Sequence, residues 1–124
     1  MPKAPIISIV DDDASVRAAT ENLVKSHGYS AHTFASAEEF LHSAHLNDTS
    51  CVIADVQMPA ITGVELLLLL RIRGHRVPFI FITAFPTEEL RARALKAGAV
   101  GFLAKPFDGA VLISCLDTSL KQKH

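Results

Sequence analysis

Charged and hydroxyl side chains directly follow or end four of the apolar runs in this sequence. The groups concerned are the carboxylates of Asp11, Asp12, Asp13 and Asp55, the hydroxyl of Thr83 and the ammonium of Lys105. Charged groups are rarely buried in an apolar core, so their positions beside β-branched runs point to a function other than packing. If the runs are parallel strands, their carboxyl ends meet at one edge of a sheet and these side chains surround a single site.

Three of these carboxylates would repel one another unless a cation compensates them. Without a cation, some of Asp11, Asp12 and Asp55 would hold a proton. Oxygen ligands without histidine or cysteine favour a hard divalent ion, with Mg²⁺ first and Mn²⁺ second. Asp13 has an ordinary explanation as the N-cap of the following helix. Capping does not explain the other three aspartates together with Lys105, so the pattern predicts a magnesium site.

A divalent cation and an ammonium beside a carboxylate are suited to phosphoryl transfer. Catalysis of that reaction consists mainly of positioning and of neutralising charge on the equatorial oxygens. A carboxylate can itself be the nucleophile and form an aspartyl phosphate. Asp55 is the best candidate because it stands alone on the middle run, between the acidic pair and the side of Thr83 and Lys105. Lys105 would hold one phosphoryl oxygen and Thr83 another.

The elements that must position these groups alternate along the chain. Strands are expected at 6–10, 30–34, 51–54, 79–83 and 100–104, with helices at 14–27, 87–97 and 108–120 and two more opening at Ser36 and Thr62. Ser36 and Thr62 each precede a glutamate by three residues, the reciprocal capping pattern. Runs 1, 3 and 4 are almost continuously apolar, as central parallel strands are. The pattern predicts an α/β fold with a doubly wound five-stranded parallel sheet of order 2-1-3-4-5.

Length and composition bound the class of protein. The 124 residues are 49% apolar with a formal net charge of -1, which predicts one domain over 1–124 without a general affinity for nucleic acid. No secretory leader begins the sequence, and no apolar run is long enough to span a bilayer. Cys51 and Cys115 are expected to be buried free thiols, with a disulfide as the alternative. We therefore expect a cytoplasmic domain without membrane contact.

Taken together, four short motifs resemble the receiver domain of bacterial two-component response regulators. They are Val10-Asp11-Asp12-Asp13, Ala54-Asp55-Val56-Gln57-Met58-Pro59, Ile82-Thr83-Ala84 and Lys105-Pro106-Phe107. Each motif alone is weak, but the set occurs in order and covers nearly the whole chain. The strings at 63–67 and 96–100 are similar to the FixJ-like branch, whose members usually carry a LuxR-like helix-turn-helix output domain. The resemblance implies a flavodoxin- or CheY-like (βα)5 sandwich.

The resemblance also implies a role for each matching residue. Asp55 matches the phosphoacceptor, which takes a phosphoryl group from the phosphohistidine of a histidine kinase. Asp12, Asp55 and the backbone carbonyl of Gln57 match the Mg²⁺ ligands, and Asp11 matches an acid that acts through water. Lys105 matches the phosphate-binding lysine, and its peptide bond to Pro106 is cis in the family.

A switch follows from the same resemblance. Thr83 would move to donate a hydrogen bond to the phosphoryl group, and Phe102 would rotate into the vacated space, remodelling the face made by the fourth helix, fifth strand and fifth helix. That face is the usual homodimer surface in relatives. Apart from the resemblance, Gln57 and Phe85 lie two residues beyond Asp55 and Thr83, where we expect them to flank the path of a hydrolytic water and to tune the lifetime: Phe85 would exclude the water, whereas Gln57 would orient it.

The implied function is transcriptional control through an output domain, with DNA contacted only through that domain. The receiver itself catalyses only its own phosphorylation and dephosphorylation, so it is not an enzyme in the ordinary sense. The sequence leaves open whether the chain is a stand-alone receiver or is cut before the output domain.

Two rival functions remain to be weighed. A haloacid-dehalogenase-like phosphatase would need a second aspartate two residues after the nucleophile, where this chain has Gln57, and a cap segment to enclose its substrate. A degenerate receiver that serves only as an interaction module is disfavoured because Asp12, Asp55, Thr83 and Lys105 are all present.

Five successive leucines at 66–70 present a separate problem. In a helix, five consecutive side chains cover every side of the helix, so one or two must point away from the sheet. Coverage by neighbouring helices is the favoured explanation, and an apolar patch for a missing domain or a partner is the alternative.

Overall fold

The computed structural model describes residues 4–121, so the predicted domain boundaries at 1 and 124 lie outside the described residues. Its strands are β1 (Ile6–Val10), β2 (Ser30–Phe34), β3 (Cys51–Asp55), β4 (Phe79–Thr83) and β5 (Gly101–Ala104). Its helices are α1 (Ala14–Ser26), α2 (Ala37–Leu41), α3 (Gly63–Ile72), α4 (Glu88–Ala97) and α5 (Gly109–Lys121), with a short 3-10 turn at Leu46–Asp48. All strand pairs are parallel and the order is β2-β1-β3-β4-β5, which confirms the predicted topology.

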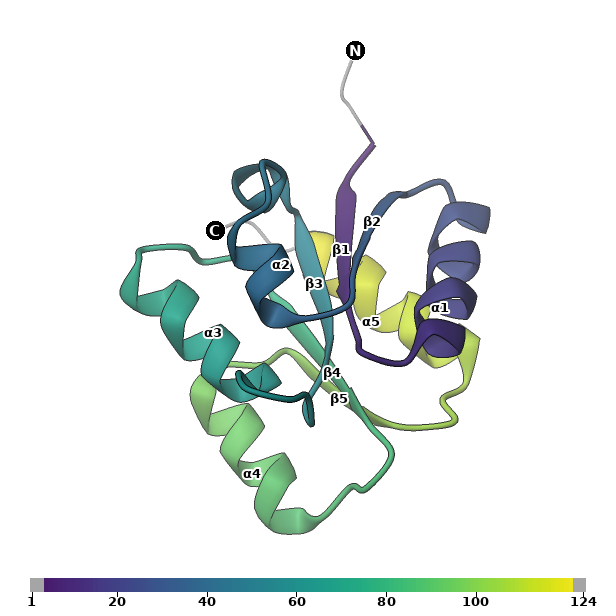
Figure 1. Ribbon diagram of the computed structural model, residues 1–124. Helices are drawn as coiled ribbons and strands as arrows, with labels where there is room; N and C mark the ends of the chain where they lie inside the picture. The colour runs from purple at the N-terminus through teal and green to yellow at the C-terminus, as the bar shows by residue number, and fades with distance from the viewer. Residues whose placement is uncertain (1–3, 122–124) are drawn as a thin grey trace.

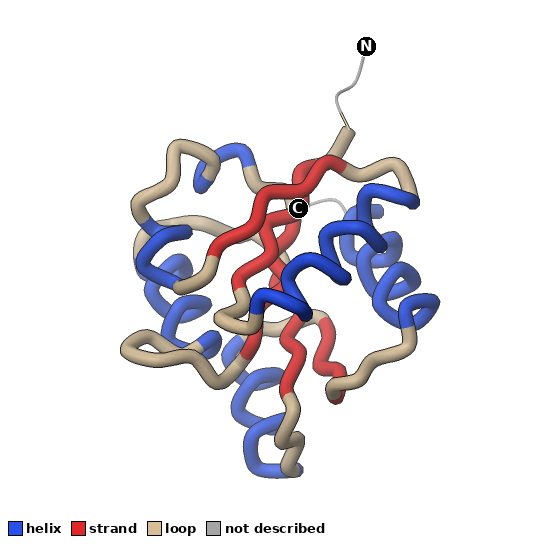
Figure 2. Tube along the Cα trace, turned by 45° about the vertical axis from the view of Figure 1, so that its right-hand side comes forward, coloured by secondary structure: helices blue, strands red, loops and turns tan. Residues whose placement is uncertain are grey.

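The sheet separates two helical layers. Helices α1 and α5 cover one face, and α2, α3 and α4 cover the other (Figure 1). Successive side chains of a strand point to opposite faces, so each strand supplies both layers. In β4, Ile80 and Ile82 pack in the cluster under α1 and α5, whereas Phe79 and Phe81 pack in the cluster under α2 to α4. Figure 2 shows the strands enclosed between the helices, as burial on both faces requires.

Local signals place the helix ends. Asp13 accepts hydrogen bonds from the backbone N–H groups of Ser15 and Val16, which confirms its predicted capping role. Thr62 and Glu65 form the full reciprocal capping box at α3. The Ser36 prediction was half wrong: Ser36 Oγ accepts the Glu39 N–H, but the Glu39 carboxylate accepts the N–H of Ala35 instead of Ser36. The box therefore closes one residue early.

Three further expectations, on the cysteines, the leucine run and membrane-spanning segments, can be compared with the fold. Both cysteines are free, and Cys51 is buried as expected, whereas Cys115 is only partly buried. Coverage of the leucine run by neighbouring helices was wrong for Leu68, whose exposed fraction is 46%. Within residues 4–121, no helix is both long and apolar enough to cross a membrane.

Candidate functional site

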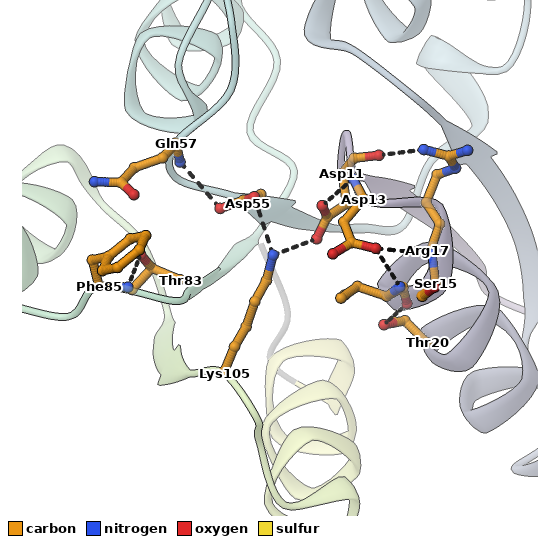
Figure 3. A network of polar contacts seen from close by, with 11 residues as sticks. Asp11, Asp13, Ser15, Arg17, Thr20, Asp55, Gln57, Thr83, Phe85 and Lys105 are labelled. Carbon is orange, nitrogen blue, oxygen red and sulfur yellow. Dashed lines mark hydrogen bonds and ion pairs between the residues drawn. The ribbon is translucent and has the colours of Figure 1, made fainter.

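The carboxyl ends of β1, β3, β4 and β5 bring the predicted groups to one edge of the sheet (Figure 3). Asp11, Asp12 and Asp55 each offer a carboxylate oxygen, and these oxygens all lie within 4.8 Å of one another. Asp11 and Asp55 are buried, whereas Asp12 is exposed. Sequence reasoning therefore identified three acids that do converge.

Lys105 joins the two buried acids. Its Nζ lies 3.1 Å from Asp55 Oδ2 and 3.0 Å from Asp11 Oδ2. The exposed fraction of the Lys105 side chain is 14%, so water screens these ion pairs only weakly. The Lys105 backbone N–H donates to the Thr83 carbonyl at 2.7 Å, which fixes the end of β5 beside β4. The peptide bond to Pro106 is cis, as the resemblance implied.

Asp55 ends β3 in a backbone frame that holds its carboxylate. Its Oδ1 accepts the N–H of Gln57 at 3.1 Å, so the following loop turns around the acid. Burial raises the pKa of Asp55 above its usual value, and the Asp11 charge adds to that rise. Hydrogen bonds from Gln57 and Lys105 oppose the rise without cancelling it. The charged form of Asp55 is therefore disfavoured, and a bound cation would stabilise it.

The same two acids favour the charged form of Lys105. Partial burial lowers the pKa of Lys105, but its hydrogen bonds and ion pairs with Asp11 and Asp55 outweigh burial and raise the pKa overall. Lys105 therefore remains a fixed positive charge at the site under ordinary conditions.

Two residues that position the site were missed from the sequence. The Arg17 guanidinium donates to the Asp11 carbonyl at 2.7 Å, which ties the end of β1 to α1. Gly63 begins α3 so close to β3 that a Cβ there would lie 2.5 Å from the Asp55 carbonyl oxygen. Arg17 gives no motif signal, but a glycine at the first position of a well-capped helix was an available clue to close packing.

The acidic cluster fits a hard divalent cation. Every donor is oxygen, and Asp11 Oδ2 is buried without a hydrogen bond of good geometry although Lys105 lies near it. The Gln57 carbonyl accepts no backbone hydrogen bond from residues 4–121, so it is not committed elsewhere in the backbone network. Mg²⁺ typically takes one or two carboxylates and keeps several waters, which suits two buried acids and an exposed one.

The predicted switch and lifetime residues flank the acids. Thr83 is fully buried, and its Oγ1 accepts the N–H of Phe85 at 3.1 Å rather than contacting Asp55. Phe85 has an exposed fraction of 68%, and Figure 3 draws it with Gln57 on the far side of Asp55 from Asp11. Phe102 on β5 is half-buried against the core cluster that contains Phe81.

A cavity lies beside Phe102 at the start of α4. Its volume is about 350 Å³, and its lining residues are Pro86, Thr87, Glu88, Arg91, Phe102 and Ala104. The Phe102 side chain therefore contacts the core on one side and lines this cavity on the other.

The sequence matches one known protein family over most of its length. The family model of the response regulator receiver domain matches residues 7–117. Response regulator protein TodT of Pseudomonas putida is 37% identical over 119 residues, covering 96% of this chain and 52% of the relative. Transcriptional regulatory protein FixJ of Azorhizobium caulinodans is 38% identical over 120 residues, covering 97% and 57%. The chain thus spans about half the length of the curated relatives it matches.

Solved structures give the same result. The crystal structure of FixJ-N superposes with a TM-score of 0.87 at 31% identity, covering 99% of this chain and 98% of that one. The response regulator StyR superposes with a TM-score of 0.87 at 36% identity, covering 96% and 60%. The predicted resemblance, including its FixJ-like character, is confirmed.

Proposed function

The chain belongs to the response regulator receiver domain family of two-component signalling, and from this we propose that Asp55 accepts a phosphoryl group from a histidine kinase. One observation carries the proposal: a buried carboxylate lies 3.1 Å from the Lys105 ammonium and within reach of two further acids. That set combines a nucleophile, a fixed cation and oxygen ligands. We assign this activity to one receiver domain over 1–124.

In the proposed step, an Asp55 carboxylate oxygen attacks the phosphorus of a kinase phosphohistidine. A P–O bond forms, the P–N bond breaks, and the imidazole leaves with the electron pair and takes up a proton. Lys105 exchanges its Asp55 contact for a phosphoryl oxygen and neutralises charge that develops there. Hydrolysis by water later reverses the modification and returns inorganic phosphate.

Receiver domains bind Mg²⁺ at an acidic pocket, and the residues of this chain fit that ion. We propose that Asp12, Asp55 and the Gln57 backbone carbonyl hold it directly, with Asp11 acting through water; Mn²⁺ would suit the same ligands. When bound, the ion neutralises charge on the transferring phosphoryl oxygens. Asp11 Oδ2 lies 3.0 Å from Lys105 Nζ, so Asp11 orients the ammonium toward the reacting edge of the sheet.

The output of the switch is also a proposal. Phosphorylation adds charge and acceptor oxygens beside Asp55, and Thr83 would give up its contact with the Phe85 N–H to donate to them. The half-buried Phe102 would then turn inward and alter the face of α4, β5 and α5, the proposed surface of a phosphorylation-dependent homodimer. TodT and FixJ are regulators, which supports control of transcription through an output domain in the cytoplasm.

Receiver domains are signalling modules, and we propose that this one catalyses only its own phosphorylation and dephosphorylation. The phosphatase alternative still lacks a general acid, because Gln57 stands two residues after the nucleophile and its side chain is exposed.

The direct test is the intact mass of the protein after incubation with acetyl phosphate and Mg²⁺. We expect a gain of one phosphoryl group that is absent in Asp55→Asn and in the presence of a chelator. Asp13→Asn serves as a matched control, because Asp13 caps α1 and should leave the gain intact. No gain, combined with no effect of Mg²⁺ on thermal unfolding, would contradict the proposal and favour an interaction-only module.

The lifetime of the phosphorylated state tests the role of Phe85. The variant Phe85→Ala removes an exposed ring from the proposed water path, so the half-life of phospho-Asp55 should shorten several-fold while stability changes little. Decay of the phosphorylated mass after donor removal measures it. An unchanged or longer half-life would remove Phe85 from the mechanism.

A further inference from the structure

The outer face of α3 is apolar although it faces solvent. Of the five leucines, Leu66, Leu67 and Leu70 are fully buried against the sheet. Leu68 and Ile72 point away, with exposed fractions of 46% and 82%. Their spacing of four residues puts them on one face of the helix, so their exposure is not scattered.

The loop before α3 extends this face into a shallow groove. The groove has a volume of about 320 Å³, and it is lined by Ala60, Ile61, Glu65, Leu68, Leu69 and Ile72. Single exposed apolar side chains are normal on soluble proteins, whereas contiguous apolar patches are more often found at interaction sites. Nothing among residues 4–121 covers this groove, because its lining residues come only from α3 and its preceding loop.

Charged side chains lie at the two ends of α3. Glu65 is in the first turn of α3, while Arg73 is its C-cap and Arg76 follows two residues after Gly74. All three are exposed, and within the described residues neither arginine side chain forms an ion pair or hydrogen bond. The N-terminal end of α3 thus carries the negative charge of Glu65, whose carboxylate also accepts the Thr62 N–H, the C-terminal end is positive, and the apolar groove lies between them.

We propose that a second copy of this chain occupies the groove, with the two α3 helices packed antiparallel. A two-fold axis between Leu68 and Leu69 brings each of these leucines opposite the other in the partner copy. The same axis sets Glu65 of each copy opposite the Ile72–Arg73 end of the other. A surface with opposite charges at its two ends is self-complementary only in this antiparallel arrangement, and a two-fold interface requires such self-complementarity.

The helix dipoles add to this complementarity. In the antiparallel pair, the positive N-terminal end of each α3 lies near the negative C-terminal end of the other. The surface is limited to one ten-residue helix and its loop, so it is smaller than the roughly 1,200–2,000 Å² of a stable interface. We therefore expect weak association that depends on concentration. This contact does not involve α4, β5 or α5 and needs no phosphoryl group.

Sedimentation velocity over a range of concentrations, without phosphodonor or Mg²⁺, tests the proposal. The wild-type mass should rise from 13.4 kDa toward twice that value as concentration increases to about 1 mM. Leu68→Glu and Ile72→Glu should each weaken association at least about tenfold, because the first buries a carboxylate in an apolar contact and the second sets a carboxylate opposite the partner's Glu65. Both positions are exposed, so circular dichroism and thermal unfolding should remain close to wild type.

Val111→Glu is the matched control, because Val111 is an apolar residue of similar exposure, 47%, on α5. It should leave the association unchanged. Arg73→Glu places like charges opposite one another and should weaken the dimer, whereas Arg91→Glu on α4 should not. A wild-type protein that stays monomeric throughout, or a dimer disrupted by Val111→Glu and not by Ile72→Glu, would overturn the proposal.

Discussion

The carboxyl edge of the sheet and the outer face of α3 depart in opposite directions from the ordinary partition of side chains. At the edge, Asp11 and Asp55 are buried although they carry charge. On α3, Leu68 and Ile72 are exposed although they are apolar. Both arrangements are unfavourable for an isolated folded chain, because buried charge and exposed apolar surface each cost free energy.

The two regions differ in how the unfavourable arrangement is relieved. At the edge, relief is internal: Lys105 contacts both acids, and backbone N–H groups of Asp13 and Gln57 donate to them. On α3, no residue among 4–121 covers the apolar groove, so any group that covers it comes from outside the described residues. This difference agrees with the two proposals, a small cation at the edge and a second protein surface on α3.

The largest effect should come from removing the internal relief. Lys105→Ala leaves Asp11 and Asp55 together without a cation, so phosphorylation by acetyl phosphate should slow by about 100-fold or more. The free energy of unfolding without Mg²⁺ should fall by about 1–3 kcal/mol, and added Mg²⁺ should recover part of it. Intact mass and urea unfolding measure the two effects.

Lys25→Ala is the control for this variant. Lys25 pairs with Glu21 at 2.9 Å, but its side chain is 54% exposed, so its removal should cost no more than about 0.5 kcal/mol and leave phosphorylation unchanged. Equal losses of stability in the two variants would mean that burial does not distinguish the edge from the surface.

Gly63 is the residue where α3 packs against the end of β3, next to the acidic edge. A Cβ at this position would meet the Asp55 carbonyl oxygen at 2.5 Å and Phe81 Cε1 at 2.9 Å. Gly63→Ala should therefore push α3 away from β3 and lower the free energy of unfolding by about 2–3 kcal/mol. Gly109→Ala, at the start of α5, has its nearest neighbour at 3.3 Å and should be nearly neutral. If urea unfolding shows no difference between these variants, the helix moves more freely than we infer.

The positions of chemistry-bearing residues could be predicted from the sequence because they depend on topology. Asp55, Thr83 and Lys105 each end or follow an apolar run, and parallel strands bring such positions together. The contact of Arg17 with the Asp11 carbonyl could not be predicted, because no sequence motif pairs a side chain in a helix with a backbone oxygen at the end of the preceding strand. The pattern did predict that one or two leucines point away from the sheet, but it could not show whether neighbouring helices cover them, so the exposure of Leu68 was not predicted.

A strained residue in the loop between the two regions offers a stabilising change. Ala60 has a φ of 67°, in the left-handed region that a Cβ disfavours. Ala60→Gly should raise the free energy of unfolding by about 0.5–1 kcal/mol, because relief of strain exceeds the added entropy of the unfolded chain. Ala44→Gly, at an exposed position without positive φ, should lower it instead. A loss of stability in Ala60→Gly, measured by thermal unfolding, would mean that the loop tolerates the alanine without strain.

The smallest expected effect concerns the histidine pair His32 and His45, where, among residues 4–121, no lysine ion pair like that of the acidic edge and no proposed partner surface offsets the cost of burial. His32 on β2 stacks on His45, with ring centroids 3.8 Å apart and an interplanar angle of 11°. Burial lowers the pKa of His32, His45 and Lys25 lower it further, and Asp48 partly opposes them. Unlike Asp55, which pairs with Lys105, His32 has only the partly opposing Asp48 charge, so the folded protein disfavours its charged form.

The sign of the pH effect follows from that lowered pKa. The unfolded chain binds the His32 proton more tightly than the folded chain, so stability should fall as pH decreases through about 6.5 toward the folded value. His32→Gln should flatten this decline, and Lys25→Met should flatten it partly. Asp48→Asn removes the opposing charge and should steepen it. Urea unfolding across this range measures the slopes, and equal slopes in the wild type and His32→Gln would show that the stacked imidazole does not contribute.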